Sequence, residues 1–180
     1  AARLPARAAV TGTRRGDTLV VKFGAFAADS AQAFAELIAR EKAAALELDL
    51  RGHTGGQVGA VLAIIGMLSP AGDSAGVEAV DVVGRDGQRE VLRATGSATF
   101  AGPVTARVDD GTASGAEVLA ASLRRSGRGQ VVGTHTFGKC LVHGIEPLQG
   151  GAVLMYTLGR LAEAGAAPWC GRGIAIDRPG

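Results

Sequence analysis

The sequence predicts a single α/β domain built on a mixed β-sheet, with helices packed on the sheet and one β-hairpin excursion. Over the first two thirds of the chain, short apolar segments typical of strands alternate with segments of helical spacing. The 180 residues suffice for one domain with a sizeable core. Aromatic residues make up only 4% of the chain and hydrophobic residues 47%, so we expect a core of Ala, Val, Leu and Ile.

The first half of the chain predicts two strand–helix units after an N-terminal arm. Residues 1–16 show no clear periodicity and are interpreted as an arm or linker before a core over 17–180. In order, the expected elements are a strand over 18–23, a helix that Asp29 or Ser30 can cap, a strand over 46–50, the turn 52–56 and an apolar helix over 57–68.

The second half is richer in strands. A hairpin is expected over 77–93, because the polar turn Arg85–Gln88 separates two strand-like segments. The later elements are expected to be a strand over 103–108, a helix over 114–125, and strands over 130–132, 141–145 and 152–158.

Charge and hydropathy exclude several function classes. The net charge is +2 from 19 basic and 17 acidic residues, so no global field recruits nucleic acid. No apolar run reaches the roughly 18 residues of a membrane span, and no signal peptide is visible. Cys140 and Cys170 can form one disulfide, but two thiols alone settle neither the pairing nor the redox compartment.

Two loops are candidates for chemistry because each joins an expected strand to an expected helix. They are Asp49–Gly56 and Asp110–Glu117. Helix N-termini offer unpaired N–H groups and the positive end of a dipole, which suit both an oxyanion hole and an activated nucleophile. Ser114, at the start of the second helix, fits two interpretations: an ordinary N-cap or a nucleophile.

A third segment favours the nucleophile interpretation. Together the three ordered segments resemble the C-terminal (tail-specific) processing peptidases, and the resemblance covers nearly the whole chain. The matching segments are Asp49–Gly56 (Asp-Leu-Arg-x-x-x-Gly-Gly), Gly111–Glu117 (Gly-[Ser/Thr]-Ala-Ser-x-x-Glu), Thr136–His143 (Thr-Phe-Gly-Lys-Gly-x-Val-Gln) and the tail Gly171–Asp177 (Gly-x-Gly-Ile-x-Pro-Asp, with Ile176 for the proline).

The resemblance implies a ClpP/crotonase-like core and a serine endopeptidase that cleaves peptide bonds near protein C-termini. Ser114 falls on the family's nucleophile and Lys139 on its general base, and the backbone N–H groups of Gly56 and Gly115 fall on its oxyanion hole. A lysine serves as a base only when its amine is neutral, a form that burial favours. The neighbours Phe137, Leu141 and Val142 are expected to supply an apolar setting for the lysine amine.

Further expectations follow from the same resemblance. The substrate is a protein or peptide, no metal or organic cofactor is implied, and the location is periplasmic or otherwise extracytoplasmic. No PDZ-like segment precedes the expected core, so a separate docking or adaptor protein is expected to capture the substrate.

Two positions near the expected base depart from the family pattern. His143 stands where the family has a glutamine that holds the lysine amine, and Cys140 stands where it has a glycine. A neutral imidazole can accept the same hydrogen bond, whereas a protonated one repels the lysine.

Three alternatives stay open from the residues themselves. The chain could be a weakened or inactive peptidase fold that only binds its partner. Gly133–Cys140 approaches a P-loop, but it lacks the final Ser or Thr and is followed by a strand-like segment. His53, His135 and His143 lie in the expected site loops, yet no pair has the spacing of metal ligands on a helix.

Overall fold

The main sheet carries the expected site loops at its strand ends. The computed structural model describes residues 10–69, 76–96 and 98–180. Within these residues the main sheet has the order β1-β2-β3-β6-β7-β10; only β1 is antiparallel to its neighbour. Its strands are β1 (Val10–Arg15), β2 (Thr18–Phe23), β3 (Ala45–Asp49), β6 (Val104–Val108), β7 (Gly129–Gly133) and β10 (Arg178–Pro179).

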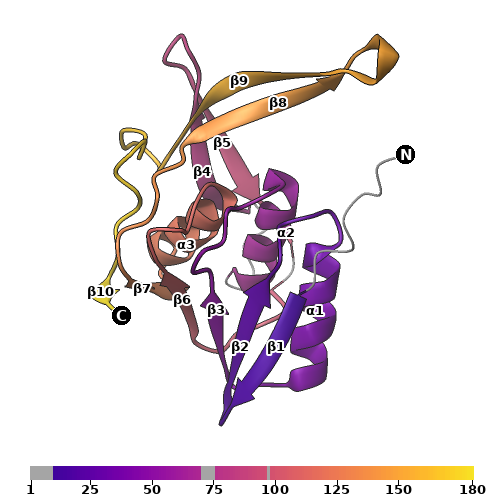
Figure 1. The fold of residues 1–180 in the computed structure, drawn as a ribbon. Helices are drawn as coiled ribbons and strands as arrows, with labels where there is room; N and C mark the ends of the chain where they lie inside the picture. The colour runs from indigo at the N-terminus through magenta and orange to yellow at the C-terminus, as the bar shows by residue number, and fades with distance from the viewer. Residues whose placement is uncertain (1–9, 70–75, 97) are drawn as a thin grey trace.

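Three helices cover this sheet and connect it to a second one (Figure 1). They are α1 (Ser30–Glu41), α2 (Val58–Leu68) and α3 (Gly115–Arg125). Helix α3 contacts β6 and β7 of the main sheet and β4 of the second sheet, while α2 contacts α1, α3, β4 and β5. Helix α2 is apolar almost throughout because it packs against elements on several sides.

The second sheet has the order β5-β4-β9-β8. Its strands are β4 (Val77–Val83), β5 (Arg89–Ala94), β8 (Leu141–Pro147) and β9 (Val153–Ala162), and the short 3-10 helix η1 (Gln149–Gly151) joins the last two. Strands β8 and β9 form a hairpin that projects from the body of the molecule (Figure 1). Apolar side chains along it are exposed, Ile145 at 69% and Met155 at 65%.

The predicted α/β class with a mixed sheet and a hairpin over 77–93 is confirmed. One interpretation is corrected: residues 10–15, assigned to an arm or linker, form strand β1 paired with β2. This strand has no alternating apolar pattern because it lies at the sheet edge, where charged side chains such as Arg14 and Arg15 blunt edge pairing. Residues 1–9 of the expected arm lie outside the described residues.

Two further differences concern strand length. Strand β8 runs unbroken through Gly144 to Pro147, because β9 pairs with it along that whole length. Strand β9 extends to Ala162, where it pairs with Asp81 of β4. In the part of the chain that the structure describes, no helix is long and apolar enough to cross a membrane.

Candidate active site

Two loops that follow neighbouring strands of the main sheet are fastened to one another. We call residues 50–56 the glycine loop and residues 109–114 the serine loop; they follow β3 and β6, respectively. Because these strands are parallel neighbours, both loops leave the same edge of the sheet. The carboxylate of Asp109 accepts a hydrogen bond from the Gly52 N–H at 2.8 Å. Two of the sequence motifs therefore meet in space.

An ion pair at the end of β3 anchors the glycine loop. Asp49 accepts hydrogen bonds from the Arg51 guanidinium at 2.7 and 2.8 Å and lies 3.2 Å from the Lys22 amine. The hydrogen bond from Arg51, reinforced by Lys22, holds the pKa of Asp49 well below its ordinary value although the carboxyl is buried. The Asp-Leu-Arg motif thus serves the loop's position rather than its chemistry.

Ser114 ends the serine loop with an unusual backbone conformation. Its φ is 56° and its ψ −121°, directly before α3 begins at Gly115. Residues other than glycine rarely adopt this region, and such strain costs about 1–3 kcal/mol. It persists only where surrounding contacts over-determine it, and such residues cluster at functional sites.

The buried carboxylate of Glu117 supplies those contacts and connects the serine to the lysine. It accepts hydrogen bonds from the Ser114 N–H at 2.8 Å, from the Thr136 hydroxyl at 2.6 Å, and from the Gly138 and Lys139 N–H groups at 2.8 and 2.9 Å. Residues 134–140, the lysine loop, are thereby fixed to the first turn of α3. One side chain sets the relative position of both expected catalytic segments.

Sequence reasoning did not assign Glu117 a role. Its place three residues after Ser114 matches the capping box, a pattern in which the glutamate side chain returns to the N-cap N–H. That pattern accounts for the contact with Ser114. The reach to the lysine loop needs the folded structure, because these contacts span 19 to 22 residues of sequence.

Among the described residues, neither the Gly56 N–H nor the Gly115 N–H donates a hydrogen bond within the protein. Gly56 and Phe26 form a parallel β-bridge that consists of two hydrogen bonds. The Phe26 N–H donates to the Gly55 carbonyl at 3.2 Å, and the Gln57 N–H donates to the Phe26 carbonyl at 2.8 Å. This parallel pattern occupies the residues on either side of Gly56, so the Gly56 N–H points away from Phe26. The Gly115 N–H lies in the first turn of α3, where helices leave donors without an intrahelical partner.

Only glycine fits where the glycine and serine loops touch. A Cβ on Gly55 would lie 2.7 Å from the Gly115 nitrogen, and one on Gly56 would lie 2.3 Å from the Phe26 carbonyl oxygen. Both residues also have φ in the range that L side chains rarely adopt, +94° and +151°. The Gly-Gly pair thus permits the close approach that brings two N–H groups together.

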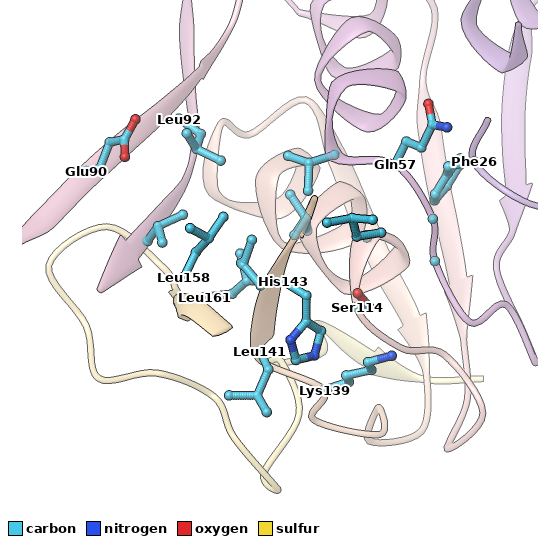
Figure 2. A pocket seen from close by; sticks show the side chains of 18 of the residues that line it. Phe26, Gln57, Glu90, Leu92, Ser114, Lys139, Leu141, His143, Leu158 and Leu161 are labelled. Carbon is cyan, nitrogen blue, oxygen red and sulfur yellow. The ribbon is translucent and has the colours of Figure 1, made fainter. Parts of the chain in front are cut away.

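All five sequence-predicted site residues line one pocket of about 1210 Å³. They come from separate elements: the glycine loop, the start of α3, the lysine loop and strand β8. Figure 2 shows the Ser114 hydroxyl, the Lys139 amine and the His143 imidazole around the same space. The five residues are Gly56, Ser114, Gly115, Lys139 and His143.

The apolar setting expected for Lys139 is not formed by its neighbours. Lys139 is exposed, and so are Phe137 at 63% and Leu141 at 40%. The reason is that the lysine loop leads directly into strand β8 of the hairpin that projects from the body of the molecule (Figure 1). Among the described residues, no hydrogen bond joins the Ser114 hydroxyl to the Lys139 amine. The dyad therefore stays a prediction.

His143 lies on β8 opposite Thr157 of β9, and its Nδ1 is 3.5 Å from the Thr157 hydroxyl. The imidazole is exposed and faces the pocket near Lys139 (Figure 2). The expected hydrogen bond between His143 and the lysine amine stays a prediction.

A disulfide between Cys140 and Cys170 fastens the lysine loop to the C-terminal segment. The Gly171 N–H donates to the Gly138 carbonyl at 2.9 Å beside it. Cys140 is buried, whereas Cys170 is exposed and open to reductant. The pairing that the sequence left open is therefore present, directly next to Lys139.

Breaking this disulfide is expected to destabilise the protein and lower its activity together. The bond closes a loop with a sequence separation of 30, which corresponds to about 3–4 kcal/mol in the chain-entropy model. The double variant Cys140→Ser/Cys170→Ser should melt at the temperature of the reduced wild type. Its melting temperature should not change when dithiothreitol is added. A double variant as stable and active as the oxidised wild type would contradict this role.

The P-loop and metal interpretations gain no support from the fold. A P-loop needs a helix directly after its lysine, but strand β8 begins at Leu141. In the described ranges, no group of three or more His, Cys, Asp or Glu side chains is placed to hold a metal ion.

Comparison with known proteins identifies relatives over most of the chain. Residues 17–178 match the model of Peptidase family S41. The chain is 37% identical over 130 residues to the chloroplastic C-terminal processing peptidase of Tetradesmus obliquus, covering 72% of this chain and 27% of the relative. It is 30% identical over 117 residues to the carboxy-terminal processing protease CtpA of Bacillus subtilis, covering 65% of this chain and 24% of the relative. The chain thus spans about a quarter of the length of these relatives.

Solved structures agree with this relationship. The photosystem II D1 C-terminal processing protease superposes with a TM-score of 0.72 at 28% identity, covering 94% of this chain and 47% of that one. A Bacteroides fragilis structure described as a putative S41 protease shares the fold with a TM-score of 0.70 at 15% identity, covering 96% of this chain and 50% of that one.

Proposed function

This chain belongs to peptidase family S41, and from that membership we propose that it is a serine endopeptidase that cleaves peptide bonds near the C-termini of proteins. The observation that carries the proposal is the convergence of Gly56, Ser114, Gly115 and Lys139 on one pocket. The strained backbone of Ser114 at a helix N-terminus adds independent support, because such strain gathers at functional sites.

In the proposed mechanism, the Ser114 oxygen bonds to the carbonyl carbon of the substrate while the Lys139 amine takes the hydroxyl proton. The oxyanion that forms accepts hydrogen bonds from the Gly56 and Gly115 N–H groups. The carbon–nitrogen bond then breaks, and the leaving amine takes the proton from Lys139. Water, activated by the same amine, hydrolyses the acyl-enzyme and restores the serine.

This mechanism requires the neutral form of Lys139, although the side chain is exposed here. A bound peptide supplies the missing cover in our proposal. The hairpin of β8 and β9 forms one wall of the pocket, and a chain lying in that pocket would exclude water from the amine. Desolvation then favours the uncharged amine when substrate is present.

We extend the proposal to location and substrate capture. Relatives include a chloroplastic peptidase and bacterial processing proteases, and the Cys140–Cys170 disulfide is typical of oxidising compartments outside the cytoplasm. On these grounds we propose an extracytoplasmic location. Capture of the substrate's C-terminus is assigned to a docking module or adaptor protein outside these residues.

The function is tested by digesting an unfolded protein substrate and locating the cuts by mass spectrometry. We expect products shortened near the C-terminus, and we expect a fluorophosphonate probe to label Ser114. Labelling without cleavage, or peptide binding without either, would instead support the weakened peptidase that only binds its partner.

His143 is expected to influence the pH dependence of turnover if its imidazole accepts a hydrogen bond from the Lys139 amine. His143→Gln should then preserve or raise activity, because the glutamine amide accepts the same hydrogen bond but cannot gain a charge that repels the lysine. His143→Ala should lower activity at every pH, because the amine loses a partner.

Thr157→Val serves as the matched control, since it removes the cross-strand contact of His143 without touching the lysine loop. The expected contact with Lys139 is refuted if the pH–rate profiles of both His143 variants superimpose on that of the wild type.

A further inference from the structure

The glycine loop contains a histidine whose side chain holds the loop itself. His53 is 6% exposed, and its Nδ1 accepts a hydrogen bond from the Gly55 N–H at 2.9 Å. Its backbone is fixed on both sides, by the His53 N–H to the Leu50 carbonyl at 3.1 Å and by the Ala113 N–H to the His53 carbonyl at 2.9 Å. The imidazole thus acts as an acceptor two residues ahead of the donor, as in an Asx-turn.

The surroundings of the ring favour the neutral imidazole. The ring centroid lies 4.4 Å from that of Phe26 and 6.4 Å from that of Phe23, whose ring is steeply inclined to the imidazole at 77°. Because Nδ1 accepts, the proton of the neutral ring sits on Nε2, which is buried and has no hydrogen-bond partner in the part of the chain that the structure describes. Burial lowers the pKa of His53 below its ordinary value of 6.5.

No charged group is positioned to offset protonation of this ring. Asp49 pairs with Arg51 and Lys22, and Asp109 bonds to the Gly52 N–H. Glu117, on the packed helix α3, bonds to Ser114 and the lysine loop. Among the described residues, no ion pair or hydrogen bond from a charged side chain reaches His53.

We propose that neutral His53 is a positioning residue that holds Gly55 and thereby directs the Gly56 N–H into the pocket. The inference deepens the proposed function, on which its catalytic consequence rests. Protonation converts Nδ1 from acceptor to donor, so it would face the Gly55 N–H donor at hydrogen-bonding distance. The ring must then leave its place, and Gly56, the next residue, loses its orientation.

The direction of the pH effect follows from the neutral ring. Below about pH 6.5 an unfolded histidine takes up a proton that the folded one resists. Stability is therefore fully present above that pH and falls as the pH is lowered. Activity falls only when the pH drops below the lowered pKa of the folded His53 ring, because the charged ring then no longer holds the glycine loop.

Two variants of the chain separate the acceptor from the charge. His53→Asn keeps an acceptor within reach of the Gly55 N–H but does not titrate. It should keep kcat within about twofold of the wild-type value at pH 8. As the pH is lowered, its kcat should fall less steeply than that of the wild type. His53→Leu fills the apolar site without an acceptor, and it should lower kcat by about tenfold or more with KM little changed. Equal kcat in the two variants would overturn the proposal.

NMR provides a readout that does not depend on catalysis. In Ser114→Ala, the amide signals of Gly55 and Gly56 should move with the same midpoint as the His53 ring, and His53→Asn in that background should abolish the movement. Glycine signals that stay still while His53 titrates would refute the positioning role. Absence of cleavage by the wild type at every pH would instead refute the proposed peptidase function and leave this measurement to decide the role of His53.

Discussion

Ser114→Ala is expected to reduce peptide hydrolysis by at least about a thousandfold, the scale on which loss of a catalytic nucleophile acts. The reason is chemical: without the hydroxyl no acyl-enzyme forms, and only the oxyanion donors and substrate binding remain. The fold should survive, with a change of about 1–2 kcal/mol at most, because the Glu117 carboxylate still accepts from the backbone N–H of residue 114. Initial rates with a quenched fluorescent peptide and a melting curve measure the two effects separately.

Lys139 provides the second arm of this experiment. Lys139→Ala should be as inactive as the serine variant, and the double variant no worse, because a nucleophile and its base act as one unit. Lys42→Ala, which removes another exposed lysine far along the chain, is the matched control and should retain activity. Wild-type activity should also rise with pH as the base loses its proton.

Two outcomes would contradict the dyad. Full turnover by Ser114→Ala in a clean preparation would remove the serine from the mechanism. A wild-type rate that stays flat from about pH 5 to about pH 9 would argue against a lysine base.

The local parts of this site could be predicted because they depend on short segments. Ser114 and Gly56 follow strands in which apolar residues alternate with polar ones, a local signal, and parallel strands present their ends at one edge of the sheet. A glycine pair and a serine at a helix start are also local signals. These features allow residues far apart in the sequence to be assigned to one pocket.

The parts that could not be predicted depend on long-range contacts. The exposure of Lys139 and Phe137 follows from the projection of β8, which no local pattern reports. The Cys140–Cys170 bond needs the C-terminal segment to return to the lysine loop. Strand β1 was missed because its residues face solvent and its pairing with β2 alone defines it.

Glu117 is the clearest case of a long-range role, and its replacement is expected to have the largest effect on stability. Glu117→Ala leaves four hydrogen-bond donors of Ser114, Thr136, Gly138 and Lys139 without their acceptor inside the protein. Buried donors without a partner cost about 1–3 kcal/mol each, and partial relaxation and water entry reduce the sum. We therefore expect the free energy of unfolding to fall by about 3–5 kcal/mol.

Glu117→Gln tests the positioning role in a protein that is more certain to fold. The amide keeps one acceptor oxygen. Its NH₂ group takes the place of the other oxygen, so that two donors now face N–H groups that need an acceptor. We expect a smaller loss of stability than in Glu117→Ala and a fall in kcat of about a hundredfold, because the serine and lysine loops are no longer held in register. KM should change little, since Glu117 is buried beneath the pocket lining.

Glu163→Gln is the matched control for this comparison. It also removes a carboxylate that contacts α3, through Arg124, but this ion pair is partly exposed and lies away from the lysine loop. Such pairs contribute about 1 kcal/mol or less, so both kcat and the melting temperature should stay near those of the wild type. If Glu117→Gln behaved like Glu163→Gln in denaturant unfolding and in kcat, the Glu117 carboxylate would not be what holds the Ser114 and Lys139 segments together.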